Sequence, residues 1–182
     1  MVELVRITLE TFEKILHGGA FGLTDGLILV LGLVSGMAEA THNTGIVIVS
    51  GITGGIANSF GNSFGMIVSG LTARQQQYHR RNHDKIETEV TSVREVIASS
   101  VFCFLMSLVS LVLPMLPFFF LPLSSGILVC VAIGVTLIFL MGYFSSKLGG
   151  EGNPIYVGLG YAVIAILGTA FCHLLGDLLR LA

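Results

Sequence analysis

One acidic residue interrupts the apolar stretch FGLTDGLILVLGLVSGM, which covers residues 21–37. Asp25 is the only charged residue in this stretch. A carboxylate in the hydrocarbon of a membrane costs roughly 2.5–3.5 kcal/mol on insertion scales, and it persists mainly where it faces a cavity or a partner. Asp25 is therefore the first candidate for a functional residue. The alternative is that Asp25 caps the amino-terminal end of a helix, where the helix dipole favours an acid.

Polar residues with a helical spacing occur in a second stretch, SGITGGIANSFGNSFGMIVSG, which covers residues 50–70. Asn58, Asn62 and Met66 follow one another at intervals of four, so they share one face of a helix. Carboxylate and amide oxygens are ligands for hard cations, and a thioether adds a ligand suited to transition metals. We therefore predict a cation path formed by Asp25, Asn58 and Asn62, with Met66 further along. The alternative for any single polar residue is a hydrogen bond that only joins two helices.

A third cluster lies in the polar sequence QQQYHRRNHDKIETE, which covers residues 75–89. His79, His83 and Glu87 are also spaced by four, and two imidazoles at this spacing can share one metal ion. Three basic residues of the same segment oppose the binding of a cation: Arg80, Arg81 and Lys85. We predict at most a weak, regulatory metal site here, and a solvated helical connector is the alternative.

The composition identifies the kind of protein that carries these residues. Of the 182 residues, 53% are hydrophobic and 11% are charged, and the mean hydropathy is +0.89. Soluble domains are typically about 25% charged. The sequence therefore predicts an all-α integral membrane protein with a single membrane domain over residues 1–182. Its net charge of −2 gives no indication of a nucleic-acid partner.

Five segments are apolar enough and long enough to cross a bilayer, which takes about 20 residues. Residues 1–19 alternate apolar and charged positions at helical spacing, which predicts an amphipathic helix that lies along the membrane surface and ends at Gly18-Gly19. Three prolines divide the long uncharged stretch after Glu95 into two spans: Pro114, Pro117 and Pro122. The predicted spans cover residues of about 20–38, 44–72, 95–116, 122–145 and 155–176.

Basic residues predict the orientation, because cytoplasmic loops carry an excess of Lys and Arg. The connector of residues 73–94 holds five of the nine basic residues and is expected in the cytoplasm. The amino terminus is then cytoplasmic as well, and the carboxy terminus lies outside, either of a prokaryotic cell membrane or of a vacuolar-type membrane.

Glycines repeat at intervals of four in the first two spans, and such pairs let helices approach closely. Gly22 and Gly26 form one pair, and Gly51 and Gly55 form another. We predict that these glycines pack at or near the two-fold axis of a homodimer. No pair of acids, HExxH motif or Ser/His arrangement occurs within the spans, so we expect no enzymatic activity and no resident cofactor.

The sequence is similar to the vacuolar iron transporter family over nearly its whole length. The matching motifs are TDGLILVLGLVSGM (24–37), GITGGIANSFG (51–61), VLPMLPFFF (112–120) and FCHLLGDLL (171–179). The resemblance implies a five-span dimer that moves Fe²⁺ or Mn²⁺ out of the cytoplasm in exchange for protons. It also implies that Asp25 is a metal and proton ligand that faces its symmetry mate. A methionine of the family's path falls at Asn58 here, and a glutamate of that path falls at Ser50.

Two other functions use the same scaffold and stay open at this point. One is a channel or carrier for another cation or a small solute. The other is a membrane interaction protein that does not transport. The family's long glutamate-rich cytoplasmic domain is replaced here by the short 73–94 connector.

Overall fold

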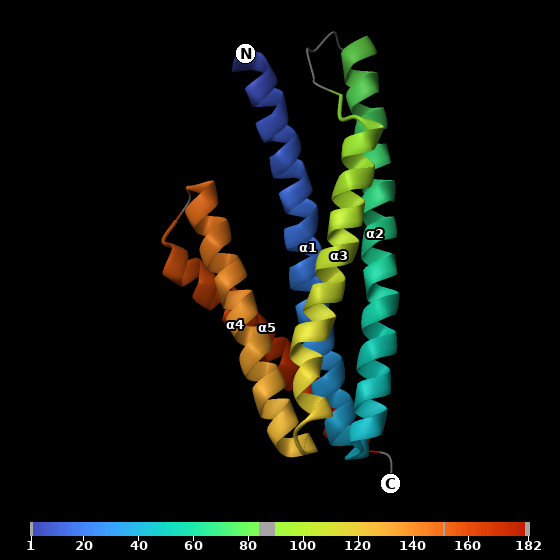
Figure 1. The fold of residues 1–182 in the computed structure, drawn as a ribbon, viewed down its shortest axis with the longest axis vertical. Coiled ribbons are helices and arrows are strands. Elements are labelled where there is room, and N and C mark those ends of the chain that lie inside the picture. Colours follow the sequence, from blue (N-terminus) through green and yellow to red (C-terminus); the bar gives the residue numbers. More distant parts are fainter. Residues whose placement is uncertain (1, 84–89, 151, 181–182) are drawn as a thin grey trace.

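The computed structural model of the chain describes residues 2–83, 90–150 and 152–180, and for residues 2–14, 82 and 83 it describes the backbone alone. Over these residues the fold is all-α (Figure 1), which confirms the predicted fold class. Its elements are α1 (Val2–Thr41), α2 (Thr44–His83), α3 (Val93–Met115), the 3-10 helix η1 (Leu116–Phe119), α4 (Leu123–Gly149) and α5 (Pro154–Leu178).

Five helices among the described residues are long and apolar enough to cross a membrane. Their candidate spans are Ile15–Thr41, Thr44–Arg81, Val93–Phe119, Leu123–Gly149 and Pro154–Leu178. The number and order of the predicted spans are therefore confirmed. Each helix extends past its predicted span at one end or both, because helices continue past the hydrocarbon wherever no residue stops them. At the proline break, α3 ends and α4 begins within one residue of the predicted limits.

The predicted end of a separate helix at Gly18-Gly19 is wrong. α1 continues without a break through both glycines, and its first turns are collinear with the span in Figure 1. Gly18 packs against Ser99 and Gly19 packs against the ring of Phe102, both on α3. The two glycines thus provide close approach between helices, and residues 2–17 extend the first span along its own axis.

The chain reverses direction at short turns, where side chains accept hydrogen bonds from the free backbone N–H groups at the helix starts. His42 takes a left-handed conformation (φ 48°) after α1, and the Asn43 side chain accepts the backbone N–H of Ile46 at 3.2 Å. Ser92 and Glu95 form a reciprocal capping box at the start of α3. Because proline lacks the N–H that continues a helix, the predicted proline break is confirmed: Pro114 lies in the last turn of α3, Pro117 in η1, and Pro122 precedes α4.

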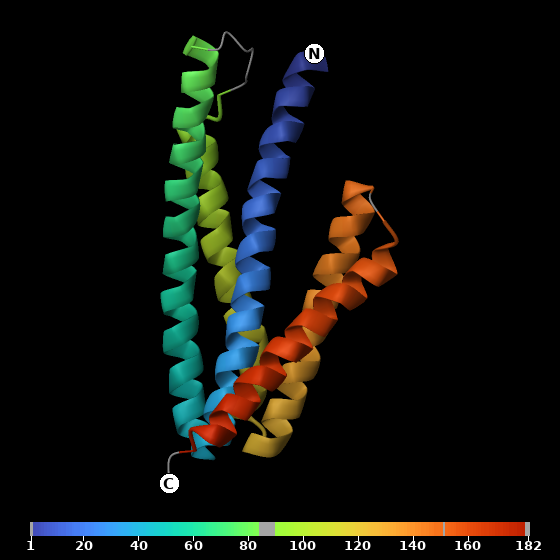
Figure 2. The same cartoon turned by 180° about the vertical axis from the view of Figure 1, so that it is seen from behind.

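α1 is the central helix of the molecule. It packs against each of the other four α-helices, and it carries the most buried apolar side chains: Leu27, Val30, Leu31 and Val34. α1, α2 and α3 run side by side, whereas α4 and α5 form a hairpin that diverges from α1 toward the end of the molecule where the amino terminus lies (Figures 1 and 2). α1 and the α4–α5 hairpin line an open cavity beside the first span.

Candidate metal and proton path

Asp25 lies deep inside the first span. It is ten residues from Ile15, the first residue of the span, which corresponds to about 15 Å of helix, half of a hydrocarbon core of about 30 Å. In the span predicted at about residues 20–38, Asp25 would lie only five residues from the end, and the longer helix places it deeper.

The role of Asp25 as a helix cap is excluded by the same observation. α1 begins at Val2 and runs to Thr41, so Asp25 lies in the interior of a continuous helix. The dipole effect falls off within the first turn of a helix, so it gives no reason for an acid at this position. The carboxylate must be stabilised by other groups.

Two amides of α2 bind this carboxylate. The Nδ2 atoms of Asn58 and Asn62 each donate a hydrogen bond to Oδ2 of Asp25, at 2.9 Å in both cases. Hydrogen bonds to charged groups contribute about 1.5–3 kcal/mol each, so two of them offset the roughly 2.5–3.5 kcal/mol that a carboxylate costs in the bilayer. The structure therefore brings together the three residues that the sequence placed in the path.

A third helix, α3, takes part in the hydrogen-bond network around Asp25, and the sequence did not predict its contribution. Asn62 Nδ2 also donates to Oγ of Ser107 at 3.1 Å, and Ser107 in turn donates to the backbone oxygen of Gly22 at 2.9 Å. A regular spacing of small residues on α3 was the available signal: Ser100, Cys103, Ser107 and Ser110 fall on one face and are all buried. The network thus ties α1, α2 and α3 together around Asp25.

An open cavity of about 370 Å³ gives access to Asp25 from the side of α4 and α5. It occupies the space where the α4–α5 hairpin diverges from α1. Its lining includes polar groups from three helices: His17, Thr24 and Asp25 from α1, Ser145 from α4, and Tyr161 from α5. A cation or a proton could reach the carboxylate through this cavity without crossing the buried core.

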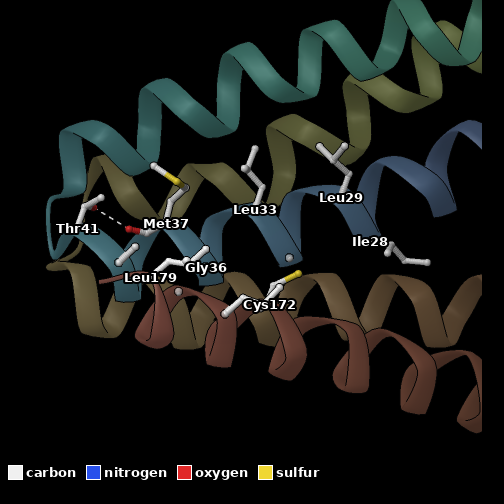
Figure 3. A pocket seen from close by; sticks show the side chains of 12 residues that line it. Ile28, Leu29, Leu33, Gly36, Met37, Thr41, Cys172 and Leu179 are labelled. Atoms are coloured by element: carbon white, nitrogen blue, oxygen red, sulfur yellow. Dashed lines mark hydrogen bonds between the residues drawn. The ribbon is translucent and has the colours of Figure 1, made fainter. Parts of the chain in front are cut away.

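A second, larger groove of about 820 Å³ continues along α1 toward its carboxy-terminal end. Ile28 lines both the groove and the cavity, so the two adjoin at this residue. The groove is apolar and lies between α1 and α5. In Figure 3, Cys172 of α5 lies against α1 beside Gly36.

Two other predicted path residues lie apart from Asp25. Met66 follows Asn62 by one turn of α2, and Ser50 precedes Asn58 by eight residues, or about 12 Å of helix. The described contacts connect neither side chain to the carboxylate, and both residues are only partly buried. They remain predicted members of a longer path.

The predicted cytoplasmic metal site falls largely outside the described residues. His79 lies on the exposed part of α2, whereas the side chain of His83 and the whole of Glu87 lie outside the described part of the chain. Among the side chains that the structure does describe, no group of three His, Cys, Asp or Glu is placed to hold a metal ion.

The glycines predicted at a dimer axis are used inside the protomer. A Cβ on Gly22 would overlap Cys103 of α3, and a Cβ on Gly26 would overlap Ser110 of the same helix. A Cβ on Gly51 would overlap Met115, and a Cβ on Gly55 would overlap Leu111, both also on α3. These four glycines therefore serve packing within the protomer, and their position near a two-fold axis stays a prediction. A Cβ on Gly61 or Gly65 would meet no atom within 4 Å, so this pair of α2 faces away from the protomer.

Comparison with known families agrees with this architecture. The model of the VIT family matches residues 17–97, which include nearly all of the first span, the whole of α2 and the start of α3. The matched segment contains Asp25, Asn58 and Asn62, the three residues that the structure joins. No curated protein matches the chain. Over this segment, which is somewhat less than half of its length, the chain is similar to the VIT family.

Proposed function

We propose that the chain moves a divalent transition metal, Fe²⁺ or Mn²⁺, out of the cytoplasm in exchange for protons, and that Asp25 carries the exchange. The observation that supports this most directly is a carboxylate half-way through a membrane span that both binds two amides and lines an open cavity. An acid held only for packing would need no such access. Ionisable groups at this depth are characteristic of ion and proton pathways.

The contacts of Asp25 suggest how the exchange works. Both amides donate to Oδ2, which leaves Oδ1 as the oxygen that a metal ion or a proton would take. A metal ion and a proton compete for the same carboxylate, so binding of the cation releases the proton. An amide of Asn58 or Asn62 that turned its oxygen toward the ion would supply a neutral ligand for one of the remaining coordination positions.

A homodimer would complete this site with a second copy of Asp25. Two ionised carboxylates near one axis repel each other, so one of them holds a proton until a divalent ion replaces it. We propose that the dimer forms through the exposed face of α2 that carries Gly61 and Gly65, since the other glycine pairs of the first two helices are occupied within the protomer.

Flux in proteoliposomes tests the proposal. Purified protein is reconstituted, and uptake of Mn²⁺ or Fe²⁺ is followed with and without a pH gradient. We expect uptake that the gradient accelerates and that Asp25→Asn abolishes, because an amide can carry neither the proton nor the charge. Asp177→Asn is the matched control, since Asp177 is an exposed acid at the end of α5.

Three results would count against parts of the proposal. Normal flux and normal pH dependence in Asp25→Asn would exclude Asp25 as the exchanging group. Flux that depends on Asp25 but not on the pH gradient would favour a cation channel on the same scaffold. No flux of any divalent ion in folded wild-type protein would favour a membrane protein that does not transport.

A further inference from the structure

A carboxylate and an imidazole from different helices meet at the far end of the first span. Oε2 of Glu39, on α1, lies 3.8 Å from Nε2 of His173, on α5. The two helices come close at this point because Gly36 and Gly176 face each other, backbone to backbone. The side chains are 24% and 50% exposed, so solvent and ions can reach both.

Glu39 lies on the same side of α1 as Asp25. The two acids are 14 residues apart, which is nearly four turns and about 21 Å of helix. Ile28, Gly32 and Gly36 line the apolar groove between them (Figure 3). Glu39 is the next acid after Asp25 along α1.

From this placement we propose that Glu39 and His173 form a second divalent-cation site, where the ion that has passed Asp25 is released. This inference rests on the proposed transport function. It assigns a second binding position, with a carboxylate oxygen and an imidazole nitrogen as the two protein ligands, to a pair that lies outside the network of Asp25.

The distance between the two atoms suits a shared metal ion better than a direct bond. At 3.8 Å the pair is longer than the 2.7–3.2 Å of an N–H···O hydrogen bond. Two metal–ligand bonds of about 2.0–2.2 Å at a tetrahedral angle separate their ligand atoms by roughly 3.3–3.6 Å, so a side-chain shift of a few tenths of an ångström would let both atoms bind one ion. As a simple ion pair at this exposure, the two side chains would contribute only about 0–1 kcal/mol.

The neighbouring charges favour a cation that binds weakly. Asp177, one turn after His173 on α5, pairs with a cation instead: its Oδ1 lies 4.0 Å from the Arg180 guanidinium, which also contacts His42. The charges of Asp177 and Arg180 offset each other, so the carboxylate of Glu39 supplies the negative charge that attracts a cation. Two protein ligands, with water in the remaining positions, hold an ion loosely enough to release it.

Binding of Mn²⁺ alone to protein in lipid nanodiscs tests this inference without any transport measurement. Asp25→Asn is used as the background, so that the first position no longer contributes. Titration followed by the electron paramagnetic resonance of free Mn²⁺ should show one Mn²⁺ per protomer, with an affinity that falls about tenfold or more in Glu39→Gln and in His173→Gln. Binding should also weaken as the pH falls, because protons compete for both ligands.

Two further variants separate a metal site from an ion pair. Glu39→His removes the ion pair but keeps a metal ligand, so it should retain most of the Mn²⁺ affinity. Asp177→Asn removes an acid that pairs with Arg180, so it should change the affinity less than threefold. Thermal unfolding and gel filtration confirm that each variant is folded.

The inference is overturned if Asp25→Asn protein binds no Mn²⁺, or if His173→Gln leaves its binding unchanged. The same holds if Glu39→His loses binding as fully as Glu39→Gln, since the pair would then act as an ion pair only. Flux through wild-type protein is measured separately, so failure of the proposed transport is recognised independently of this site.

Discussion

At the scale of single residues, Asp25 shows how neutral amide groups can hold a carboxylate within a membrane helix. Its Oδ2 accepts two amide hydrogen bonds, and the amides come from successive turns of one neighbouring helix. A guanidinium or ammonium group here would compete with a transported cation. Neutral donors stabilise the acid and still leave it able to attract a metal ion.

We predict that the two asparagines contribute unequally. Both hold Oδ2, but only Asn62 also reaches Ser107. Asn58→Ala should reduce metal flux about tenfold, since a hydrogen bond to a charged group contributes about 1.5–3 kcal/mol. Asn62→Ala should reduce flux at least as much as Asn58→Ala. It should also lower the melting temperature more than Asn58→Ala, because it removes the hydrogen bond to Ser107 of α3 as well. Flux assays and thermal denaturation of the purified variants measure both effects.

Ser107→Ala is the control for this prediction. It removes the contact with α3 but leaves both amides on the carboxylate, so stability should fall while flux persists. If Asn58→Ala and Asn62→Ala both transport at the wild-type rate, the amides serve packing alone.

At the scale of helices, close packing between α1 and α3 determines where Asp25 lies. Gly18, Gly22 and Gly26 follow one another at intervals of four on α1 and face small residues of α3. A glycine inside a helix ordinarily costs about 1 kcal/mol relative to alanine. In a membrane this cost is offset by the close backbone approach that glycine allows. The serine face of α3 is thereby brought within reach of the asparagines of α2.

Glycines that face a neighbour and glycines that face outward should respond differently to a large side chain. Gly26→Leu should destabilise the protomer by about 1–3 kcal/mol or more, because it forces a side chain into a filled contact. Gly65→Leu should leave the protomer folded and should weaken crosslinking between subunits. Thermal denaturation and chemical crosslinking in membranes distinguish the two outcomes.

Gly160→Leu provides the comparison for these variants, because a Cβ at Gly160, on α5, also meets no atom within 4 Å. Crosslinking that survives Gly65→Leu and falls in Gly160→Leu would move the proposed dimer interface from α2 to α5.

At the scale of the whole molecule, the helices arrange the chain into two unlike ends. The amino terminus of α1 lies at the same end as the junction of α4 and α5, and the carboxy terminus lies at the opposite end (Figures 1 and 2). The cavity at Asp25 adjoins the first end, where the α4–α5 hairpin diverges. The pair of Glu39 and His173 lies at the second end. This polarity is what a directional path requires.

The basic residues predict which end faces the cytoplasm. A reporter that is active only in the cytoplasm should be active when fused to residue 1 and inactive when fused to residue 182. The physical reason is that the 73–94 connector carries five Lys and Arg residues, and such loops are retained in the cytoplasm. Activity of the carboxy-terminal fusion would reverse the assignment of the two ends of the path.

The sequence by itself determined the fold class, the number of spans and the candidates Asp25, Asn58 and Asn62. Hydropathy identifies membrane helices because backbone groups must pair internally in lipid. An acid in such a helix is unusual enough to be noticed alone, and the interval of four places both asparagines on one face. The proline break before α4 was also readable, because proline stops a helix wherever it occurs.

Only the tertiary structure decided which groups these residues touch. Gly18-Gly19 reads as a helix end, yet both glycines stay helical because α3 packs on them. The glycine pairs of the first two spans favour an interface, but a spacing does not say whether the neighbour belongs to the same chain. Ser107 and His173 are ordinary in sequence, and they gain partners only because α3 and α5 cross α1 at glycines. Contacts between distant segments depend on how helices cross, and the crossing is set by side chains on both helices together.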